Sequence, residues 1–385
     1  MKRNFVVILL TFIAIILAGC QKDEYIARKY YLNNAFSIMP QVLVVDKESK
    51  IKKYEENNLA KELSAITDEL DDTFNIFEDR GDENPIKKIN NNSGIAPVKV
   101  SDEVIEVIKT AIYVTNLSYQ EEKALYDITI LPVWELWGFR DESYGKVRDI
   151  PTPEEIEGKL DLIDYKKIII DEENNTVFLA EEGMKIDLGS IVKGYATDKI
   201  KEYLLSKNIE NAIIDVGGNI MTMGYNYYND APWTVRIKTP YITYDVTDPY
   251  YDPNYNLNYY VGTLYYTDIT AVTSGVYERY IVNEGKEYHH IINPSTGYPI
   301  DNDLISTTIL TKDSMMADAI STTAFSLGLE EGYELVESLD SFEAIFITKD
   351  LEVYVTSGLI DEFIFNTNLE KINYTYKGVK NGTNN

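Results

Sequence analysis

The sequence predicts an α+β fold in which mixed and antiparallel sheets pack against helices. Some segments have the three-to-four-residue spacing of apolar side chains that is typical of a helix, and others alternate apolar and polar residues as a strand does. These segments do not follow one another in the regular strand–helix order that a doubly wound sheet requires. With 385 residues, of which 44% are hydrophobic, the chain is long enough to bury a large core.

Charge and cysteine content exclude several classes of protein. Asp and Glu total 63 against 36 for Lys and Arg, which gives a net charge of -27. Such a chain repels phosphate backbones, so we expect no binding to nucleic acid. One cysteine and two histidines exclude a disulfide framework and leave few ligands for a zinc site. A bound metal is therefore expected to be held by oxygen atoms.

The N-terminus has the pattern of a secretory signal. Lys2 and Arg3 precede an apolar run from Phe5 to Leu17. This run is too short to cross a bilayer comfortably, but it suits the apolar region of a signal peptide. We therefore expect residues 1–19 to be a cleaved signal peptide that is not part of the fold.

The single cysteine follows this run directly. Leu17-Ala18-Gly19-Cys20 resembles the bacterial lipobox, in which the cysteine is lipidated and becomes the N-terminus of the mature chain. An ordinary signal peptide followed by an incidental cysteine is the alternative. The lipobox predicts a protein that is anchored through Cys20 to the extracytoplasmic face of a bacterial cell membrane, with residues 20–33 as its tether.

The first third of the chain predicts two amphipathic helices with a loop between them. Ser101 stands where the second helix needs an N-cap residue, and the polar segment from Glu78 to Ser93 is expected to be the loop. The apolar side chains that define the helices are Leu59, Leu63, Ile66, Leu70, Phe74 and Phe77 in the first, and Val104, Val107, Ile108, Ala111 and Ile112 in the second.

The middle of the chain predicts a hairpin, a helix and a buried strand. Residues 167–170 and 176–179 alternate around a polar turn and are expected to pair. Residues 186–188 lead through Gly189 into a helix, and residues 212–216 form a short buried strand that ends in two glycines.

The last third predicts an insertion, a strand and a helix. The stretch 240–266 is rich in Tyr, Asp and Asn and lacks a helical period, so we expect a surface insertion with hairpin character. Residues 305–311 alternate as a strand. Asp313 then caps a helix that is expected to end near Gly328.

Two turns that contain glycine could bind a phosphate. In the segment from Asp187 to Tyr195, a strand turns through glycine into a helix whose first amides attract an anion, and Lys193 adds a positive charge. In Asp215-Val216-Gly217-Gly218-Asn219, paired glycines let a ligand approach the backbone. Each segment also has a purely structural interpretation, as a helix cap in the first case and as a β-turn in the second.

A third motif contains the two histidines of the chain. It runs from Thr273-Ser274-Gly275-Val276-Tyr277-Glu278-Arg279 to His289 and His290 and on to Gly297. Because adjacent side chains of a strand point to opposite faces, at most one histidine faces a given site. Histidine is a natural general base near neutral pH, although a lone histidine is more often structural.

A fourth motif places a carboxylate and a hydroxyl on one helix face. Asp318 and Thr322 are four residues apart, and their neighbours are mostly apolar. A hard cation could bind both oxygens. A solvated helix face is the alternative.

Together the four motifs supply a phosphate cradle, a cation, oxygen ligands for a metal and a candidate base, which suits attack on a pyrophosphate. In this order they closely resemble the FAD:protein FMN transferase family, also called the ApbE family. The segment from Tyr126 to Phe139, with Asp127, Pro132 and Trp137-Gly138-Phe139, adds a fifth match. The resemblance extends from about Phe36 to Phe365 and implies a T-fold-like flavin transferase domain at residues 34–385.

The resemblance also implies roles for individual residues. His290 corresponds to the histidine that deprotonates the acceptor hydroxyl. Asp318 and Thr322 correspond to side-chain ligands of Mg²⁺, and Ser190 to the residue that offers its backbone carbonyl to the metal. The implied contacts to FAD are Met39, Phe77, Tyr126, Asp127, Asp187 and Lys193. Gly217 and Gly218 are added as FAD contacts because of their paired-glycine turn.

Members of this family bind FAD and Mg²⁺, transfer the FMN part to a Thr or Ser hydroxyl of an acceptor protein, and release AMP. By this resemblance we expect covalent flavinylation of exported or membrane-bound redox proteins. Two other functions remain open on the sequence alone. One is an FAD pyrophosphatase that uses water and yields FMN and AMP, and the other is a non-catalytic flavin-binding or solute-binding lipoprotein.

Overall fold

A computed structural model describes residues 23–78, 84–120, 123–139, 144–240 and 260–380. In this part of the chain the centre is a nine-stranded sheet in the spatial order β1-β2-β9-β10-β13-β16-β17-β18-β20. All neighbouring pairs are antiparallel except β18 and β20, which are parallel. The strands are β1 (Tyr25–Tyr31), β2 (Gln41–Lys47), β9 (Ala212–Val216), β10 (Asn219–Met223), β13 (Ile269–Gly275), β16 (Leu304–Thr311), β17 (Glu343–Thr348), β18 (Glu352–Val355) and β20 (Thr375–Val379).

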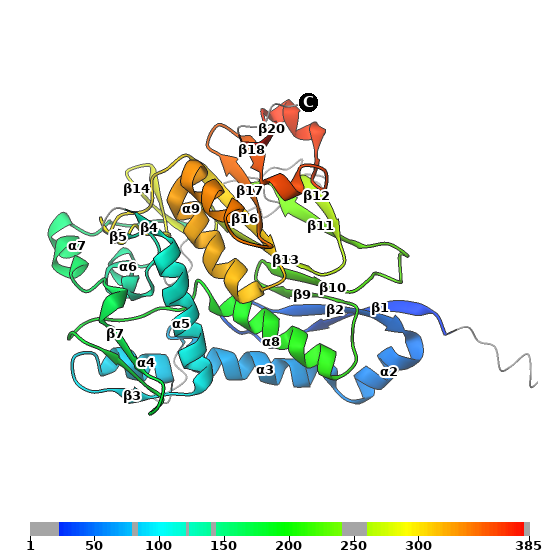
Figure 1. Cartoon of the computed structure of the whole chain (residues 1–385), viewed down its shortest axis with the longest axis horizontal. Coiled ribbons are helices and arrows are strands. Elements are labelled where there is room, and N and C mark those ends of the chain that lie inside the picture. The colour runs from blue at the N-terminus through cyan, green and yellow to red at the C-terminus, as the bar shows by residue number, and fades with distance from the viewer. Residues whose placement is uncertain (1–22, 79–83, 121–122, 140–143, 241–259, 381–385) are drawn as a thin grey trace, which may run out of the picture.

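Helices pack against this sheet, with α8 and α9 in direct contact with its strands (Figure 1). Helix α3 packs on α8, and α5 packs on α9. This arrangement confirms the predicted α+β class. The helices are α2 (Glu48–Glu56), α3 (Leu59–Phe74), α4 (Pro85–Asn91), α5 (Asp102–Leu117), α6 (Leu131–Trp137), α7 (Pro153–Leu160), α8 (Val192–Ser206) and α9 (Ser314–Glu337), with 3₁₀ helices η1 (Ile128–Ile130), η2 (Tyr165–Lys167), η3 (Ser357–Leu359) and η4 (Thr367–Ile372).

Smaller sheets surround the central one. Their strands are β11 (Trp233–Lys238), β12 (Tyr260–Tyr266) and β19 (Ile364–Phe365) in one sheet, β15 (Lys286–His289), β14 (Tyr280–Asn283) and β6 (Tyr144–Val147) in a second, β3 (Val98–Lys99), β8 (Thr176–Leu179) and β7 (Ile168–Asp171) in a third, and the pair β4 (Tyr119–Gln120) and β5 (Lys123–Ala124). The predicted hairpin is thus β7 and β8, which pair antiparallel from Ile168↔Leu179 to Asp171↔Thr176.

The alternation of side chains along the central strands separates two hydrophobic cores. In β17, Ala344 and Phe346 belong to the main core with α8 and α9, whereas Ile345 and Ile347 belong to a second core with β11 and β12. Strand β16 lies between the two cores, and all of its residues are buried. Strand β16, which precedes α9, is therefore held by packing on both faces. This packing also holds the start of α9 in position.

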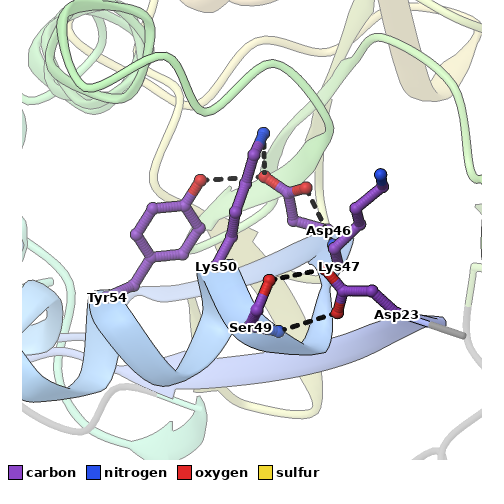
Figure 2. Close-up of polar contacts among 6 residues, drawn as sticks. All are labelled: Asp23, Asp46, Lys47, Ser49, Lys50 and Tyr54. Atoms are coloured by element: carbon purple, nitrogen blue, oxygen red, sulfur yellow. Dashed lines mark hydrogen bonds and ion pairs between the residues drawn. The ribbon is translucent and has the colours of Figure 1, made fainter. Parts of the chain in front are cut away.

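The folded part of the chain begins earlier than the sequence analysis predicted. Residues 25–31, assigned to a tether, form β1 and pair with β2 from Tyr25↔Lys47 to Tyr31↔Gln41. Figure 2 shows how this segment is attached to α2: Asp23 accepts hydrogen bonds from the backbone N–H of Ser49 (3.1 Å) and from its hydroxyl (2.5 Å). Nearby, Asp46 accepts from Tyr54 Oη over 2.8 Å and from Lys50 Nζ over 3.2 Å.

The predicted loop from Glu78 to Ser93 contains a short helix, α4. Pro85 stands at its first turn, and the side chain of Asn84 caps it by accepting from Lys87 N over 2.8 Å. With only Ile86 and Ile89 buried, the helix is too short to show a recognisable period. The first predicted helix ends at Phe74, so that Phe77 lies beyond it. The predicted cap of α5 is present, since Ser101 accepts from Val104 N over 3.4 Å.

The predicted C-terminal helix is confirmed with an extension. Asp313 caps α9 by accepting from Met316 N over 2.9 Å. Gly328 has φ 81° and ψ -179°, so the helix is interrupted where it was predicted to end, and a second helical segment continues to Glu337. Of the predicted insertion 240–266, residues 241–259 lie outside the described residues, and residues 260–266 form β12, which pairs with β11 and β19.

The predicted signal peptide, residues 1–19, and Cys20 also lie outside the described residues. Among the helices that the structure does describe, none has the length and apolarity needed to span a bilayer.

Candidate active site

A cavity of about 230 Å³ opens where α8, α9 and the ends of several strands meet. Its walls come from the residues after α3, from η1, from the first turn of α8, from the end of β13 and from the segments around β14 and β15. Most of the predicted site residues converge on it, although they are far apart in sequence. Those that line it are Phe77, Tyr126, Asp127, Asp187, Ser190, Lys193, His290, Asp318 and Thr322.

The carboxylate of Asp318 is held at the cavity wall by the neighbouring helix. Asp318 is only 4% exposed, and its Oδ2 accepts a hydrogen bond from the backbone N–H of Gly194 over 3.0 Å. A Cβ atom on Gly194 would lie 2.1 Å from the carbonyl oxygen of Ser314. Only glycine therefore lets the first turn of α8 approach α9 closely enough to hold this carboxylate.

A chain of hydroxyl groups orients Thr322 on the same helix. Ser321 Oγ donates to the carbonyl oxygen of Asp318 over 2.8 Å. Ser274 Oγ lies 2.8 Å from Ser321 Oγ and 3.1 Å from Thr322 Oγ1. Because the Ser321 proton is used on a carbonyl, Ser274 donates to Ser321 and accepts from Thr322. The lone pairs of Thr322 are then left for a ligand in the cavity.

Ser190 lies just before α8, and its side chain contacts Tyr126. The two hydroxyl oxygens are 2.9 Å apart. Burial raises the pKa of Tyr126 well above its ordinary value, so the phenol stays protonated at neutral pH. This pair fixes the turn that carries Gly189 and Ser190 next to the cavity.

His290 is neutral and has one ring nitrogen available for a proton. Its Nδ1 lies 3.1 Å from the carbonyl oxygen of Arg279. A carbonyl only accepts, so Nδ1 carries the proton and Nε2 has a lone pair. Burial, with the nearby charge of Arg279, lowers the pKa of His290 to about 3. The imidazole is therefore unprotonated at neutral pH, with the Nε2 lone pair available.

The other histidine is structural, which agrees with the expectation that at most one of the two faces the site. Nε2 of His289 donates to the carbonyl oxygen of Ile300 over 2.8 Å, and its ring packs edge-on against Phe325 with centroids 5.8 Å apart. It is not among the residues that line the cavity. Burial lowers the pKa of His289 to about 4.

Charged groups of both signs line the cavity. Lys193 and Arg279 supply positive charge, and Asp187, Glu278 and Asp318 supply carboxylates. Burial raises the pKa of Glu278, and the charges of Lys193 and Arg279 oppose that rise. Burial also raises the pKa of Asp187, whose Oδ1 accepts from Gly189 N over 3.0 Å. Cations held beside a cavity of this kind can neutralise phosphate oxygens.

The oxygen atoms at this site fit a hard divalent cation such as Mg²⁺. Asp318 uses one carboxylate oxygen for Gly194, and Thr322 has lone pairs that the hydroxyl chain leaves unused. Among the described residues, no group of three or more His, Cys, Asp and Glu side chains could hold a metal on its own. A cation here would therefore rely on the hydroxyl of Thr322, on a backbone carbonyl such as that of Ser190, and on oxygens of the substrate.

Comparison with known proteins agrees with this geometry. A sequence model of the ApbE family matches residues 42–346, a range that contains every cavity-lining residue singled out above. The chain belongs to the ApbE family.

Relatives and solved structures of the ApbE family extend the match over most of the chain. An FAD:protein FMN transferase of Klebsiella pneumoniae is 33% identical over 277 residues, which are 71% of this chain and 78% of that protein. An ApbE protein of Thermotoga maritima superposes with a TM-score of 0.69 at 27% identity, over 86% of this chain and 98% of that chain. The flavin transferase ApbE of Vibrio cholerae gives a TM-score of 0.69 at 24% identity, over 86% and 98% of the two chains. These structures confirm the predicted ApbE-like fold.

Three of the predicted FAD contacts do not line the cavity, namely Met39, Gly217 and Gly218. Met39 is 59% exposed. The glycines have φ 61° and 92° and form the two-residue turn of the hairpin between β9 and β10, in which Val216 pairs with Asn219. The structural interpretation of this pair, a β-turn after a buried strand, is the one that the fold supports.

Asp127 lines the cavity, but its oxygens are used within the ApbE fold. Oδ1 accepts from the backbone N–H of Thr129 over 2.8 Å and from its hydroxyl over 2.7 Å, and Oδ2 accepts from Tyr165 N over 3.1 Å. Burial raises the pKa of Asp127. These contacts show Asp127 as the residue that holds η1 in place, so that Tyr126 faces the cavity.

The sequence analysis singled out the motif around Ser274, Glu278 and Arg279 but gave these residues no individual roles. The structure places all three in the cavity wall. It also adds Trp134 of α6, whose ring lies 5.3 Å from that of Phe77. Arg279 could have been identified as a candidate from the sequence, because it is a cation that follows a glycine-containing strand in a strongly acidic chain.

Proposed function

We propose that this protein transfers the FMN part of FAD to a threonine or serine hydroxyl of an acceptor protein, that it depends on Mg²⁺, and that it releases AMP. The observation that carries the proposal is the meeting of Asp318, Thr322 and a neutral His290 in one cavity. Membership of the ApbE family supports it, because relatives such as the Klebsiella pneumoniae protein are named FAD:protein FMN transferase.

In this reaction the acceptor oxygen bonds to the phosphorus of the FMN phosphate, and the bond from that phosphorus to the bridging oxygen breaks. AMP leaves with the bridging oxygen. His290 takes the proton of the acceptor hydroxyl on Nε2, since Nδ1 is occupied by the Arg279 carbonyl. General-base catalysis of this kind contributes roughly 10²–10⁴-fold.

The other groups of the cavity bind and orient the pyrophosphate. Lys193 and Arg279, which line the cavity, would neutralise phosphoryl oxygens, and Asp318 and Thr322 would hold the cation. Mg²⁺, when bound, withdraws charge from the pyrophosphate and stabilises the leaving phosphate. Trp134 and Phe77 supply apolar wall next to these polar groups.

The direct test is an incubation of the purified full chain with FAD, Mg²⁺ and candidate exported or membrane-bound redox proteins, read out by in-gel flavin fluorescence. Asp318→Ala is expected to abolish the labelling. Asp340→Ala removes an equally charged but exposed residue and is expected to leave labelling unchanged. An Asp318→Ala protein that labels as well as the wild type would contradict the metal role.

The same incubation separates transfer from hydrolysis. We expect AMP release to require the acceptor. AMP release at an equal rate without any acceptor would instead assign the protein as an FAD pyrophosphatase, and tight FAD binding with no turnover would assign it as a flavin-binding protein.

We also propose that the protein is lipidated on Cys20 and lies on the extracytoplasmic face of a bacterial cell membrane. The support is the Leu-Ala-Gly-Cys segment after the apolar run of residues 5–17. Metabolic labelling with a fatty-acid analogue should label the wild type and not Cys20→Ser. Equal labelling of the two would contradict the anchor.

A further inference from the structure

A second concavity, of about 520 Å³, adjoins the active-site cavity. It shares Ile76, Phe77 and Trp134 with that cavity, so the two are separated only by this apolar wall. Its other residues come from α4, α6, β6 and the segments that follow α6 and β6 or precede α8. Helices α4 and α6 lie on the same side of the molecule (Figure 1). We call it the cationic groove, after Lys87, Lys146, Arg148 and Lys185 in its lining.

Three of these four cations have no carboxylate partner among the described residues. Lys87 Nζ donates to the backbone carbonyl of Glu78, and Arg148 Nη1 donates to the carbonyl of Gly138 over 2.8 Å. A carbonyl fixes the position of a cation without neutralising its charge. Lys146 is exposed and makes no ion pair within the described part of the chain. Only Lys185 is neutralised, by Glu135 at 2.6 Å.

Arg148 lies against the backbone of Gly138. Gly138 follows α6 with φ 64°, and a Cβ atom at this position would lie 1.8 Å from Arg148 Nη1. The glycine therefore both ends the helix and lets the guanidinium lie against the backbone. One N–H of the guanidinium is used on Gly138, and the remaining donors are left for an anion.

The groove contrasts with the rest of the molecule. A chain of net charge -27 repels an anionic partner at most of its surface, and a local group of cations that lack carboxylate partners in the described part of the chain attracts one instead. Such a patch selects the part of an anionic partner that can approach, and the orientation in which it does so. Here the patch is next to the cavity in which His290 lies.

We propose that the cationic groove binds an acidic segment of the acceptor protein close to the hydroxyl that is modified. This inference rests on the proposed function, because it assigns the surface that presents the acceptor to His290. The groove is separate from the pyrophosphate site: none of its four cations lines the active-site cavity. It therefore acts on the affinity for the acceptor and not on the affinity for FAD.

The test uses two dye-labelled peptides of equal length, each with one threonine, which is flanked by Asp residues in one and by Asn residues in the other. Binding to the full chain is measured by fluorescence anisotropy. We expect the Asp peptide to bind about tenfold more tightly at low salt, and the difference to vanish as the ionic strength rises from about 0.05 M to about 0.5 M. Equal binding of the two peptides at low salt would overturn the proposal.

Charge-reversal variants locate the binding surface. Lys146→Glu/Arg148→Glu is expected to remove the preference for the Asp peptide. Lys53→Glu/Lys61→Glu makes the same change in net charge at exposed positions of α2 and α3 and is expected to keep it. Equal losses of the preference for the Asp peptide in the two double variants would mean that net charge alone is responsible, and would overturn the proposal that the cationic groove is the binding surface. Thermal unfolding of each variant verifies the fold.

Two further measurements separate this inference from the proposed function. The KM for FAD should be the same in the groove variant and the wild type, and a raised KM for FAD would show that the groove binds the nucleotide instead. Specific binding of the Asp peptide without FMN transfer to any acceptor would support the role of the cationic groove and contradict the proposed transferase function.

Discussion

The backbone N–H of Gly194 donates a hydrogen bond to Oδ2 of Asp318 over 3.0 Å, joining the first turn of α8 to α9 at the wall of the cavity. The two residues are brought together by the contact between these helices, both of which pack on the central sheet. Asp198 of α8 strengthens the same junction, since it accepts from Ser314 N over 3.3 Å and from Met315 N over 2.8 Å. The position of the buried carboxylate is thus set by helix packing and not by a flexible loop.

Gly194→Ala is expected to destabilise the protein by about 1–3 kcal/mol, because its Cβ would overlap the Ser314 backbone. Gly158→Ala is the matched control: Gly158 lies in α7, and its Cβ would meet nothing within 4 Å. There the same substitution should raise the free energy of unfolding by about 0.5–1 kcal/mol. Urea unfolding measures both. A Gly194→Ala protein as stable as the wild type would show that the helices can separate at no cost.

In the proposed reaction Ser274 is a positioning residue for the cation ligand Thr322, since it accepts a hydrogen bond from the Thr322 hydroxyl. Ser274→Ala is expected to weaken Mg²⁺ binding about tenfold, the size of effect that loss of an outer hydrogen bond has on a metal ligand. Calorimetric titration of Mg²⁺ measures this without any turnover, and Ser274→Thr should restore affinity. Ser326→Ala is the control, because Ser326 donates to the Thr322 carbonyl and not to its hydroxyl. Unchanged affinity in Ser274→Ala would contradict the hydroxyl chain.

The hairpin turn at Gly217 offers a test of what the paired glycines do. Gly217→Ala is expected to lower stability by about 1 kcal/mol, since φ is 61°. Gly217→Asn should cost less, because Asn tolerates this conformation. Neither should change the affinity for FAD, measured by quenching of flavin fluorescence, because the glycine does not line the cavity. A loss of FAD affinity in both variants would show instead that the glycines belong to the FAD-binding site.

The elements predicted correctly from the sequence were those with a long local pattern. Strand β16 and the caps of α5 and α9 could be predicted because each depends on neighbouring residues. Helix α4 was missed because it buries only Ile86 and Ile89. Strand β1 was missed because its side chains are mostly exposed and its backbone bonds to β2 have no signature in the sequence.

The residues of the candidate site likewise divide into those that a local sequence pattern could predict and those that it could not. Asp318 and Thr322 could be paired from helical spacing, and the opposite directions of His289 and His290 followed from strand geometry. Ser274 could not be assigned, because it reaches Thr322 only through the packing of β13 on α9. The glycine pair was ambiguous, because a tight turn and a phosphate cradle need the same freedom of φ.

The depressed pKa of His290 makes a specific prediction about stability and pH. In the folded protein the pKa is about 3, whereas the value in an unfolded chain is near 6.5. Between these values the unfolded state binds a proton at His290 that the folded state does not. Stability from this group is therefore complete above pH 6.5 and is lost as the pH falls, with a slope of at most about 1.4 kcal/mol per pH unit.

His290→Gln removes this titration and keeps a side chain that can donate to the Arg279 carbonyl. Comparison with the wild type isolates His290, because His289 and the buried carboxylates remain in both proteins. We expect the difference in the free energy of unfolding between wild type and variant to be constant above pH 7 and to shift steadily against the wild type from pH 6.5 down to pH 4. Urea unfolding across this range measures it. A difference that does not change with pH would mean that His290 titrates alike in the folded and unfolded chain, and would contradict the depressed pKa of the buried imidazole.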